Sequence, residues 1–384
     1  MVIVTDNEAL EKVCEGLSQT EFFAVDTEFL RESTYWSKLC LIQVAGGDVE
    51  AIIDPLAEGL DMRPFLSIMA DTSITKVFHA ARQDLEIFYR LMGQVPLPLF
   101  DSQIAAMAAG LGDSIGYDTL VQKMLKKSVD KGSRFTDWSR RPLSDKQLTY
   151  AIGDVTHLRD LYPLLIGRLN ERDRLSWVDE EMAGLINPAI YQFDPEDAWR
   201  RMKIRKYTPP WLAVMRLVTR WREREAQTRD KPRGRILKDD AIYELAQQAP
   251  RSVEALGRMR AIPRGFERSS MAQGLLAAIN EAMSDPEKHA PQISRPPVMP
   301  SGLGPVVELL KVLLRIKAEE LGVAPRLIAN AADIERLAAF DDADIAALKG
   351  WRYEAFGKEA LRLKNGELSL TLKGKRAVIE QRQG

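Results

Sequence analysis

Four acidic residues from three separate segments have the side chains and the setting for metal-ion chemistry. They are Asp26 and Glu28 in FFAVDTEFL, Asp84 in VFHAARQDLEIF, and Asp154 in YAIGDVTHL. Each lies in or beside an apolar stretch that reads as buried, where an unpaired carboxylate is costly. Divalent cations commonly neutralise such a cluster. The residue types therefore predict a site for hard, oxygen-preferring ions such as Mg²⁺ or Mn²⁺.

The local spacing places these side chains in pairs. Asp26 and Glu28 are two residues apart at the end of a predicted strand, so both point to one face. Tyr150 precedes Asp154 by one helical turn, and the two side chains share a helix face. Two ions roughly 3.5–4 Å apart can clamp the attacking and leaving oxygens of an in-line displacement. Four acids and a tyrosine thus fit a two-metal phosphodiesterase, in which Tyr150 orients or activates the water.

Each residue also has a plainer interpretation. Asp84 alone could be a first-turn acid that interacts with the helix dipole. Asp154 alone could be a solvent-facing helix acid, and Tyr150 a core aromatic. Other acids were assigned to turns and helix starts and kept out of the site: Asp6, Asp54, Asp101 and Asp118.

Composition excludes several other classes of site. The 384 residues suffice for two or three domains, and the net charge of −1 confines any affinity for nucleic acid to local patches. The only cysteines, Cys14 and Cys40, predict no structural zinc or disulfide, and three histidines are too few for a multi-histidine site. There is no recognisable signal peptide and no long apolar run, so we expect a cytoplasmic protein without a membrane partner.

The order of patterns predicts an α/β domain with a mixed sheet in the first half of the chain. FFAVDTE, KLCLIQVA and VEAIID read as an antiparallel meander. A helix near 61–71, a strand at TKVFHA, a helix ending at Gly93, a strand at PLFD and the helix SQIAAMAAGL follow. After Pro142 the chain is expected to be helical to about 184.

Beyond about 185 the strand signals end, and two helical units are predicted. Residues 211–283 read as a bundle, residues 306–384 as further helices, and ILKDDAIYELA in the first aligns without gaps to IANAADIERLA in the second. We expect four parts: an α/β domain that carries the acidic residues at 1–200, helical domains at 206–285 and 302–384, and a proline-rich linker at 286–301.

The three acidic motifs, in this order, resemble the tyrosine-containing branch of the DEDD exonucleases, and the chain is similar to the ribonuclease D family. The resemblance rests on DTE at 26–28, on Asp84, and on Tyr150-x-x-x-Asp154, together with FFAVDTEFLRESTYWSKLCLIQVA and WSRRPLSDKQLTYAIGDVTHL. It implies a ribonuclease-H-like fold followed by two all-α HRDC-type domains. It also implies 3′→5′ hydrolysis that releases 5′-monophosphates from tRNA precursors and small structured RNAs.

The resemblance assigns roles to the five residues. It makes Asp26, Glu28, Asp84 and Asp154 ligands of two Mg²⁺ or Mn²⁺ ions, and Tyr150 the residue that positions water. Neighbouring side chains could hold the substrate: Phe29, Tyr35 and Trp36 by stacking, His79 and Gln83 beside Asp84, and Lys131, Arg134 and Arg141 on phosphates. The alternatives are core packing for the aromatics and His79, and a solvated basic loop for the cations.

Basic residues are concentrated in one stretch, at 200–238, with fourteen Lys or Arg against three acids. Such a block favours contact with RNA through phosphates, although an ordinary basic helix face is the alternative. We expect a monomeric 3′→5′ exoribonuclease acting on RNA with a free 3′ end. A DNA 3′→5′ exonuclease and a catalytically inactive nucleic-acid-binding scaffold are the competing functions, since the acids alone cannot select the sugar.

Overall fold

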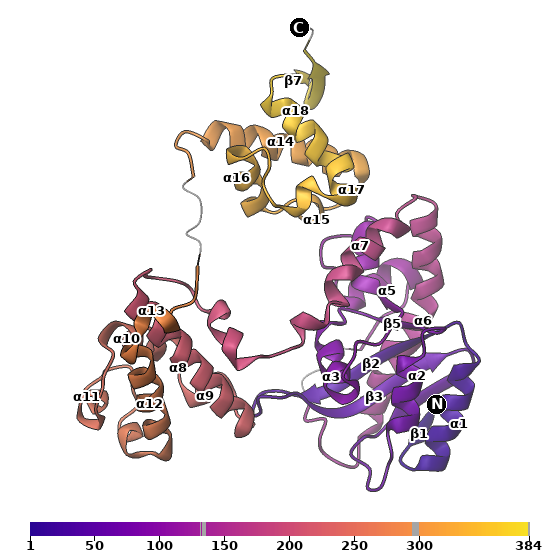
Figure 1. The fold of residues 1–384 in the computed structure, drawn as a ribbon. Coiled ribbons are helices and arrows are strands. Elements are labelled where there is room, and N and C mark those ends of the chain that lie inside the picture. Colours follow the sequence, from indigo (N-terminus) through magenta and orange to yellow (C-terminus); the bar gives the residue numbers. More distant parts are fainter. Residues whose placement is uncertain (131, 133–135, 294–298, 383–384) are drawn as a thin grey trace. The chain divides into compact units, whose positions relative to one another are not determined.

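The computed structural model describes residues 1–130, 132, 136–293 and 299–382 (Figure 1). The chain forms two compact units. The first comprises Met1–Glu28, Leu41–Pro188 and Pro297–Gly384, and the second Phe29–Cys40 and Ala189–Pro296.

A six-stranded mixed sheet forms the centre of the first unit, which confirms the predicted α/β class. Its spatial order is β1-β4-β3-β2-β5-β6. β3 and β4 pair antiparallel, whereas β1 with β4, β2 with β5, and β5 with β6 pair parallel. The strands are β1 (Val2–Val4), β2 (Phe22–Leu30), β3 (Lys38–Gly46), β4 (Val49–Ile53), β5 (Thr75–Phe78) and β6 (Leu99–Asp101).

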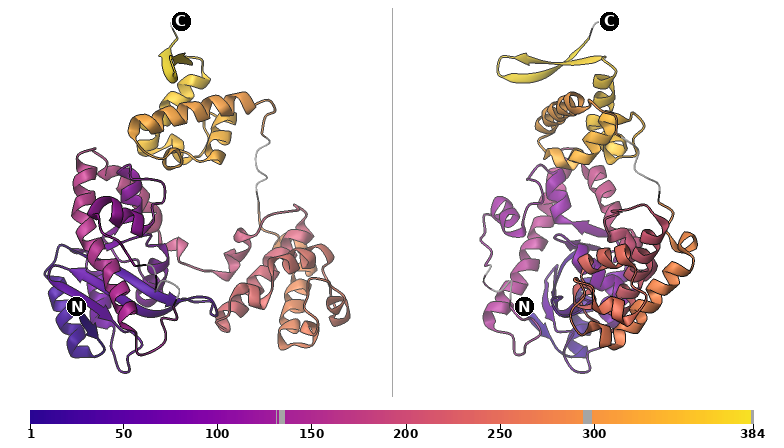
Figure 2. Two further views of the ribbon diagram at one scale, coloured as in Figure 1. Left: turned by 180° about the vertical axis from the view of Figure 1, so that it is seen from behind. Right: turned by 90° about the vertical axis from the view of Figure 1, so that its left-hand side faces the viewer.

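Helices cover both faces of this sheet (Figure 2). Ala24 and Val77 lie in one core with α4, α5 and α6, while Phe78 on the opposite face contacts Phe88 of α3 at 6.1 Å between ring centroids. Because strand residues alternate between faces, residues 24, 26 and 28 of β2 point toward α6. The helices are α1 (Asn7–Ser18), α2 (Arg63–Ala70), α3 (Arg82–Met92), α4 (Ser102–Ala108), α5 (Tyr117–Leu125), α6 (Asp145–Asn170) and α7 (Leu175–Leu185).

The C-terminal part of the first unit is helical, as predicted, except for one β-hairpin. A core of its own holds the helices together, but β7 (Leu368–Lys373) and β8 (Arg376–Gln381) form an antiparallel hairpin. The expectation of helices throughout 306–384 is therefore wrong at this end. The alternating pattern LSLTLK and the turn at Gly374, whose φ is +65°, carry the hairpin signal. The helices are α14 (Gly304–Leu321), α15 (Pro325–Ile328), α16 (Ala331–Ala339), η4 (Ala346–Leu348), α17 (Gly350–Arg352), η5 (Tyr353–Gly357) and α18 (Lys358–Lys364).

The second unit is a helical bundle around α8 (Pro209–Thr228), whose apolar side chains fill its core. It extends further than the predicted bundle at both ends, because η2 precedes it and α13, with Ala290 and Ile293, packs against the same core. The extended linker therefore does not begin at 286. The remaining helices are η1 (Pro188–Ile190), η2 (Pro195–Arg201), α9 (Arg233–Ile236), α10 (Asp239–Gln248), α11 (Val253–Gly257), η3 (Phe266–Arg268), α12 (Ser270–Ser284) and α13 (Pro286–His289).

The two helical parts share an order of elements. In each, a long helix (α8 or α14) is followed by a four-residue helix ending at Ile236 or Ile328, and then by the helix of the aligned motif, α10 or α16. We propose on this basis that the second part is a divergent copy of the first.

The structure also shows the state of the two cysteines and the apolar length of the helices. Cys14 and Cys40 are both buried free thiols. None of the helices in the described part of the chain is both long enough and apolar enough to cross a membrane.

Candidate active site

Strand β2 and helix α6 bring three carboxylates together. Asp26 and Glu28 leave β2 on the face that α6 covers, and α6 presents Asp154 from its buried side. One carboxylate oxygen from each residue lies within 4.8 Å of the others. Residues as far as 128 positions apart in the chain thus form one cluster, whereas the spacing arguments aligned side chains only within each of the two separate pairs.

Asp84 approaches β2 from the opposite side and is not one of the three carboxylates that meet within 4.8 Å. It lies in the first turn of α3, is buried, and accepts a hydrogen bond from the hydroxyl of Thr27. Thr27 stands between Asp26 and Glu28 and therefore points to the α3 face. The structure thus places Asp84 beside the strand that carries the other two acids.

Asp101 fixes the turn from which α3 begins. Its buried carboxylate accepts hydrogen bonds from the backbone N–H groups of Ala80, at 3.1 Å, and Ala81, at 2.8 Å. Ala80 has a φ of +58°, a conformation that non-glycine residues rarely adopt. Asp101 also caps α4 through Gln103 N–H, as the sequence predicted, so its role is to hold the scaffold of Asp84.

The acids repel one another. Burial raises the pKa of Asp26 to about 6, against a hydrogen bond from the Thr27 backbone that lowers it. Burial and the charge of Asp26 raise the pKa of Asp84 well above its usual value. These carboxyls therefore resist joint ionisation unless a cation lies among them.

The donor set fits divalent metal ions. All the converging ligands are carboxylate oxygens, which hard cations prefer, and burial disfavours the charged forms of Asp26 and Asp84, a penalty that a bound cation would offset. We propose Asp26, Glu28, Asp84 and Asp154 as the ligands. When bound, the ions would activate water and offset negative charge on the leaving oxygen.

Tyr150 lies one turn before Asp154 and is half-buried, with its ring near Trp138. Burial, the charges of Asp154 and Glu28, and a hydrogen bond with Asp154 all raise its pKa. Its hydroxyl therefore keeps its proton in the metal-free protein. We propose that Tyr150 orients water as a hydrogen-bonding group.

A second tyrosine, Tyr117, was not found by sequence reasoning. Its hydroxyl donates to the backbone carbonyl of Asp154, and a 3.3 Å hydrogen bond links it to the carbonyl of Gly153. Burial and the charge of Asp154 raise its pKa. The available signal was its helical spacing from Leu120 and Val121, which places a phenol on a buried face where it needs a partner.

Replacing Tyr117 with Phe should loosen the helix turn that holds Asp154. We expect Mn²⁺ affinity to fall about tenfold, the size of effect seen when a ligand's supporting hydrogen bond is lost. Calorimetric titration of the metal-free protein with Mn²⁺ measures this directly. Tyr162→Phe is the matched control, because Tyr162 lies farther along α6 and packs between Phe22 and Phe100. Equal Mn²⁺ affinities in the two variants would show that Tyr117 only fills space.

The structure leaves two of the proposed substrate residues open and gives a third a structural role. Phe29 directly follows Glu28 in β2, and Gln83 is exposed in the first turn of α3; both remain proposals. His79 pairs through Nδ1 with the Ser102 hydroxyl at 2.9 Å, and burial lowers its pKa. An uncharged, engaged imidazole supports the structural alternative for His79.

Tyr35 and Trp36 pack in the core of the helical unit, which favours the core-packing alternative over stacking on bases. Tyr35 is 6% exposed, and its hydroxyl is hydrogen-bonded to Glu223 and Arg233. The N–H groups of both residues donate to Asp230 at 3.0 Å. Their role is to anchor residues 29–40 in the core of the second unit.

Of the three proposed phosphate-binding cations, only Arg141 lies among the described residues. Arg141 makes a two-pronged ion pair with Asp54 and donates to the carbonyl of Trp138 at 2.7 Å. Its guanidinium holds the loop before α6, so the phosphate role is corrected. Lys131 and Arg134 lie outside the described residues.

Comparison with known proteins agrees with this fold. Residues 1–170 match the family model described as 3'-5' exonuclease, and residues 211–279 match the HRDC domain. A ribonuclease D of Nitrobacter hamburgensis is 47% identical, with all of both chains covered. One from Granulibacter bethesdensis is 46% identical, covering 98% of this chain and 96% of its own. The crystal structure of Escherichia coli RNase D matches with a TM-score of 0.83 and 29% identity, covering 95% of this chain and 98% of that chain.

The α/β fold, the acid cluster and the matched family model define a 3′→5′ exonuclease of the metal-dependent DEDD class. At full-length coverage and nearly half identity, the chain belongs to the ribonuclease D family. It is accordingly a 3′→5′ exoribonuclease with an HRDC domain.

Proposed function

We propose that this enzyme trims the 3′ ends of tRNA precursors and other small structured RNAs, one 5′-monophosphate at a time. Two Mg²⁺ or Mn²⁺ ions serve the reaction, and a single chain acts in the cytoplasm, where such precursors occur. The supporting observation is the cluster of Asp26, Glu28 and Asp154 within 4.8 Å, with Asp84 beside β2. The Escherichia coli relative is described as taking part in structured RNA processing, which supports the substrate class.

A direct test uses a tRNA precursor with a short unpaired 3′ trailer. With Mg²⁺ or Mn²⁺ we expect stepwise loss of the trailer and release of nucleoside 5′-monophosphates, identified by mass spectrometry. EDTA should abolish release, because the carboxylates that meet in the site carry no positive charge that could offset the charge on the leaving oxygen. A matched DNA strand should be degraded more slowly.

Three results would count against parts of this proposal. Equal rates on DNA and RNA would favour the DNA exonuclease alternative, and binding without release would favour an inactive scaffold. Endonucleolytic fragments, or release that survives EDTA, would contradict the two-ion mechanism. If the trailer is degraded no faster than an unstructured oligonucleotide, the exoribonuclease activity stands but tRNA precursors are no longer supported as its substrate.

A further inference from the structure

More than half of the cations in the stretch 200–238 meet carboxylates inside the helical unit. Eight of its fourteen cations form ion pairs with carboxylates, among them Arg222 with Asp239 and Arg233 with Glu223. The others are Arg200, Arg201, Arg216, Arg220, Arg224 and Arg229. The density of basic residues in the sequence therefore overstates the charge available to a ligand.

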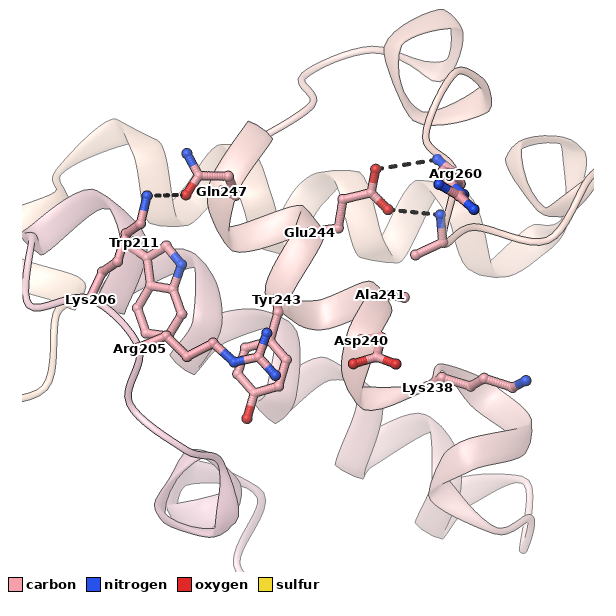
Figure 3. Close-up of a pocket in the computed structure, with 11 residues that line it drawn as sticks. Arg205, Lys206, Trp211, Lys238, Asp240, Ala241, Tyr243, Glu244, Gln247 and Arg260 are labelled. Atoms are coloured by element: carbon pink, nitrogen blue, oxygen red, sulfur yellow. Dashed lines mark hydrogen bonds between the residues drawn. The ribbon is translucent and has the colours of Figure 1, made fainter.

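Three of the six cations of this stretch that have no such pair among the described residues lie at one cavity of the same unit. Arg205, Lys206 and Lys238 line it together with Arg260, and none of the four has an ion pair among the described residues (Figure 3). The cavity has a volume of about 720 Å³, within the range of sites for small ligands. Two acids, Asp240 and Glu244, also line it, so the four cations are in excess.

A flat, rigid platform forms part of the cavity wall. The Arg205 guanidinium lies over the Tyr243 ring (Figure 3), 3.6 Å from the ring centroid. The Tyr243 hydroxyl accepts the backbone N–H of Lys203 at 2.9 Å, and Trp211 lies nearly parallel behind the ring, at 12°. The ring is thus held before any ligand arrives, and the exposed Arg205 plane offers a face for stacking.

Of the two acids, Glu244 is committed to the protein. Its carboxylate accepts the backbone N–H groups of Arg260, at 3.2 Å, and Ala261, at 2.7 Å (Figure 3). This contact fixes the loop from which the Arg260 side chain extends. Glu244 therefore positions the Arg260 side chain at the cavity, and the two backbone N–H groups partly offset the charge of the Glu244 carboxylate.

We propose that this cavity binds one nucleotide of the RNA substrate upstream of its 3′ end. The base stacks on the Arg205–Tyr243 platform, and Lys206, Lys238 and Arg260 contact the adjoining phosphates. Stacking planes beside free cations recognise single-stranded RNA, in which base faces and phosphates are both accessible. The inference rests on the proposed function, because it takes the substrate of that reaction as the ligand.

The test compares two double variants of the full chain, each losing two exposed positive charges. Arg205→Gln with Arg260→Gln removes cavity cations, and Arg258→Gln with Arg264→Gln removes exposed arginines of the same unit outside it. Binding of a 20-nucleotide RNA is measured by fluorescence anisotropy with EDTA, which prevents hydrolysis. We expect Kd to rise about tenfold for the cavity variant alone, and the slope of log Kd against log salt to fall by about 1.4 for two lost charges.

A short substrate separates this inference from the proposed function. Both double variants should hydrolyse a trinucleotide at the parental rate, since the catalytic acids are untouched; failure of the parental protein on it would reject the proposed function instead. A 4-thiouridine RNA should crosslink to the peptide containing Tyr243. Unchanged RNA affinity in the cavity variant would overturn the proposal. A cavity variant that retains its RNA affinity but no longer binds poly-glutamate would also overturn the proposal, because the ligand would then be an acidic peptide.

Discussion

Asp26→Asn should lower kcat at least about a thousandfold while the protein remains folded. The carboxylate is one of three that meet within 4.8 Å, and removing its charge weakens the hold on ions that offset several kcal/mol of transition-state charge. Release of monophosphate from 3′-labelled RNA measures the rate, and Mn²⁺ titration measures the affinity. Asp48→Asn is the matched control, because Asp48 is exposed between β3 and β4.

The same substitution should stabilise the metal-free protein at neutral pH. The pKa of Asp26 is raised from 3.8 to about 6, so its stabilising contribution is complete below about pH 4 and is lost as the pH rises through about 6. Above that pH range the buried, ionised carboxylate lowers the free energy of unfolding by on the order of 1 kcal/mol. The neutral amide of the Asn variant removes this destabilisation. We expect the Tm in EDTA to rise by about 2 °C at pH 7.5, with a smaller gain at pH 5. A variant that is both less stable and inactive would point to a structural role.

The active-site acids were predictable because short-range geometry determines their directions. Alternation along a strand sends Asp26 and Glu28 to one face, and helix periodicity aligns Tyr150 with Asp154. The sequence did not show that β2 separates Asp84 from α6, with Thr27 reaching the acid from the other face. That arrangement depends on the strand order, which local patterns do not encode.

The incorrect assignments all depend on contacts between distant residues. Tyr35 meets Glu223, 188 positions away, and Arg141 meets Asp54, 87 positions away. Nothing near either residue in sequence distinguishes a stacking aromatic from a core aromatic, or a phosphate clamp from half of an ion pair. The positive charge that the stretch 200–238 offers to a ligand was overestimated for a related reason, because a count of charges does not record which arginines meet carboxylates.

Tyr150→Phe should lower kcat about a hundredfold, the usual range for loss of a positioned proton-handling group. The phenol carries one hydroxyl that Phe lacks, and its ring packs near Trp138 at 6.0 Å between centroids, so the substitution removes the hydrogen bond and retains the packing. Because Tyr150 is not among the proposed ligands, the Mn²⁺ affinity should change by less than about threefold. Kinetics and titration of the same preparation separate the two effects.

The pH profile tests how Tyr150 acts. Burial and the neighbouring carboxylates raise its pKa, so the hydroxyl stays protonated at neutral pH and serves as a donor or acceptor without changing charge. The rate of the Phe variant should therefore be lower at every pH from about 6 to 9, with a profile of unchanged shape. A profile that loses an ionisation step would instead make the phenolate a base, and an unchanged rate would remove Tyr150 from the mechanism. Tyr162→Phe in the same helix, with its ring between Phe22 and Phe100, should retain the parental rate and profile.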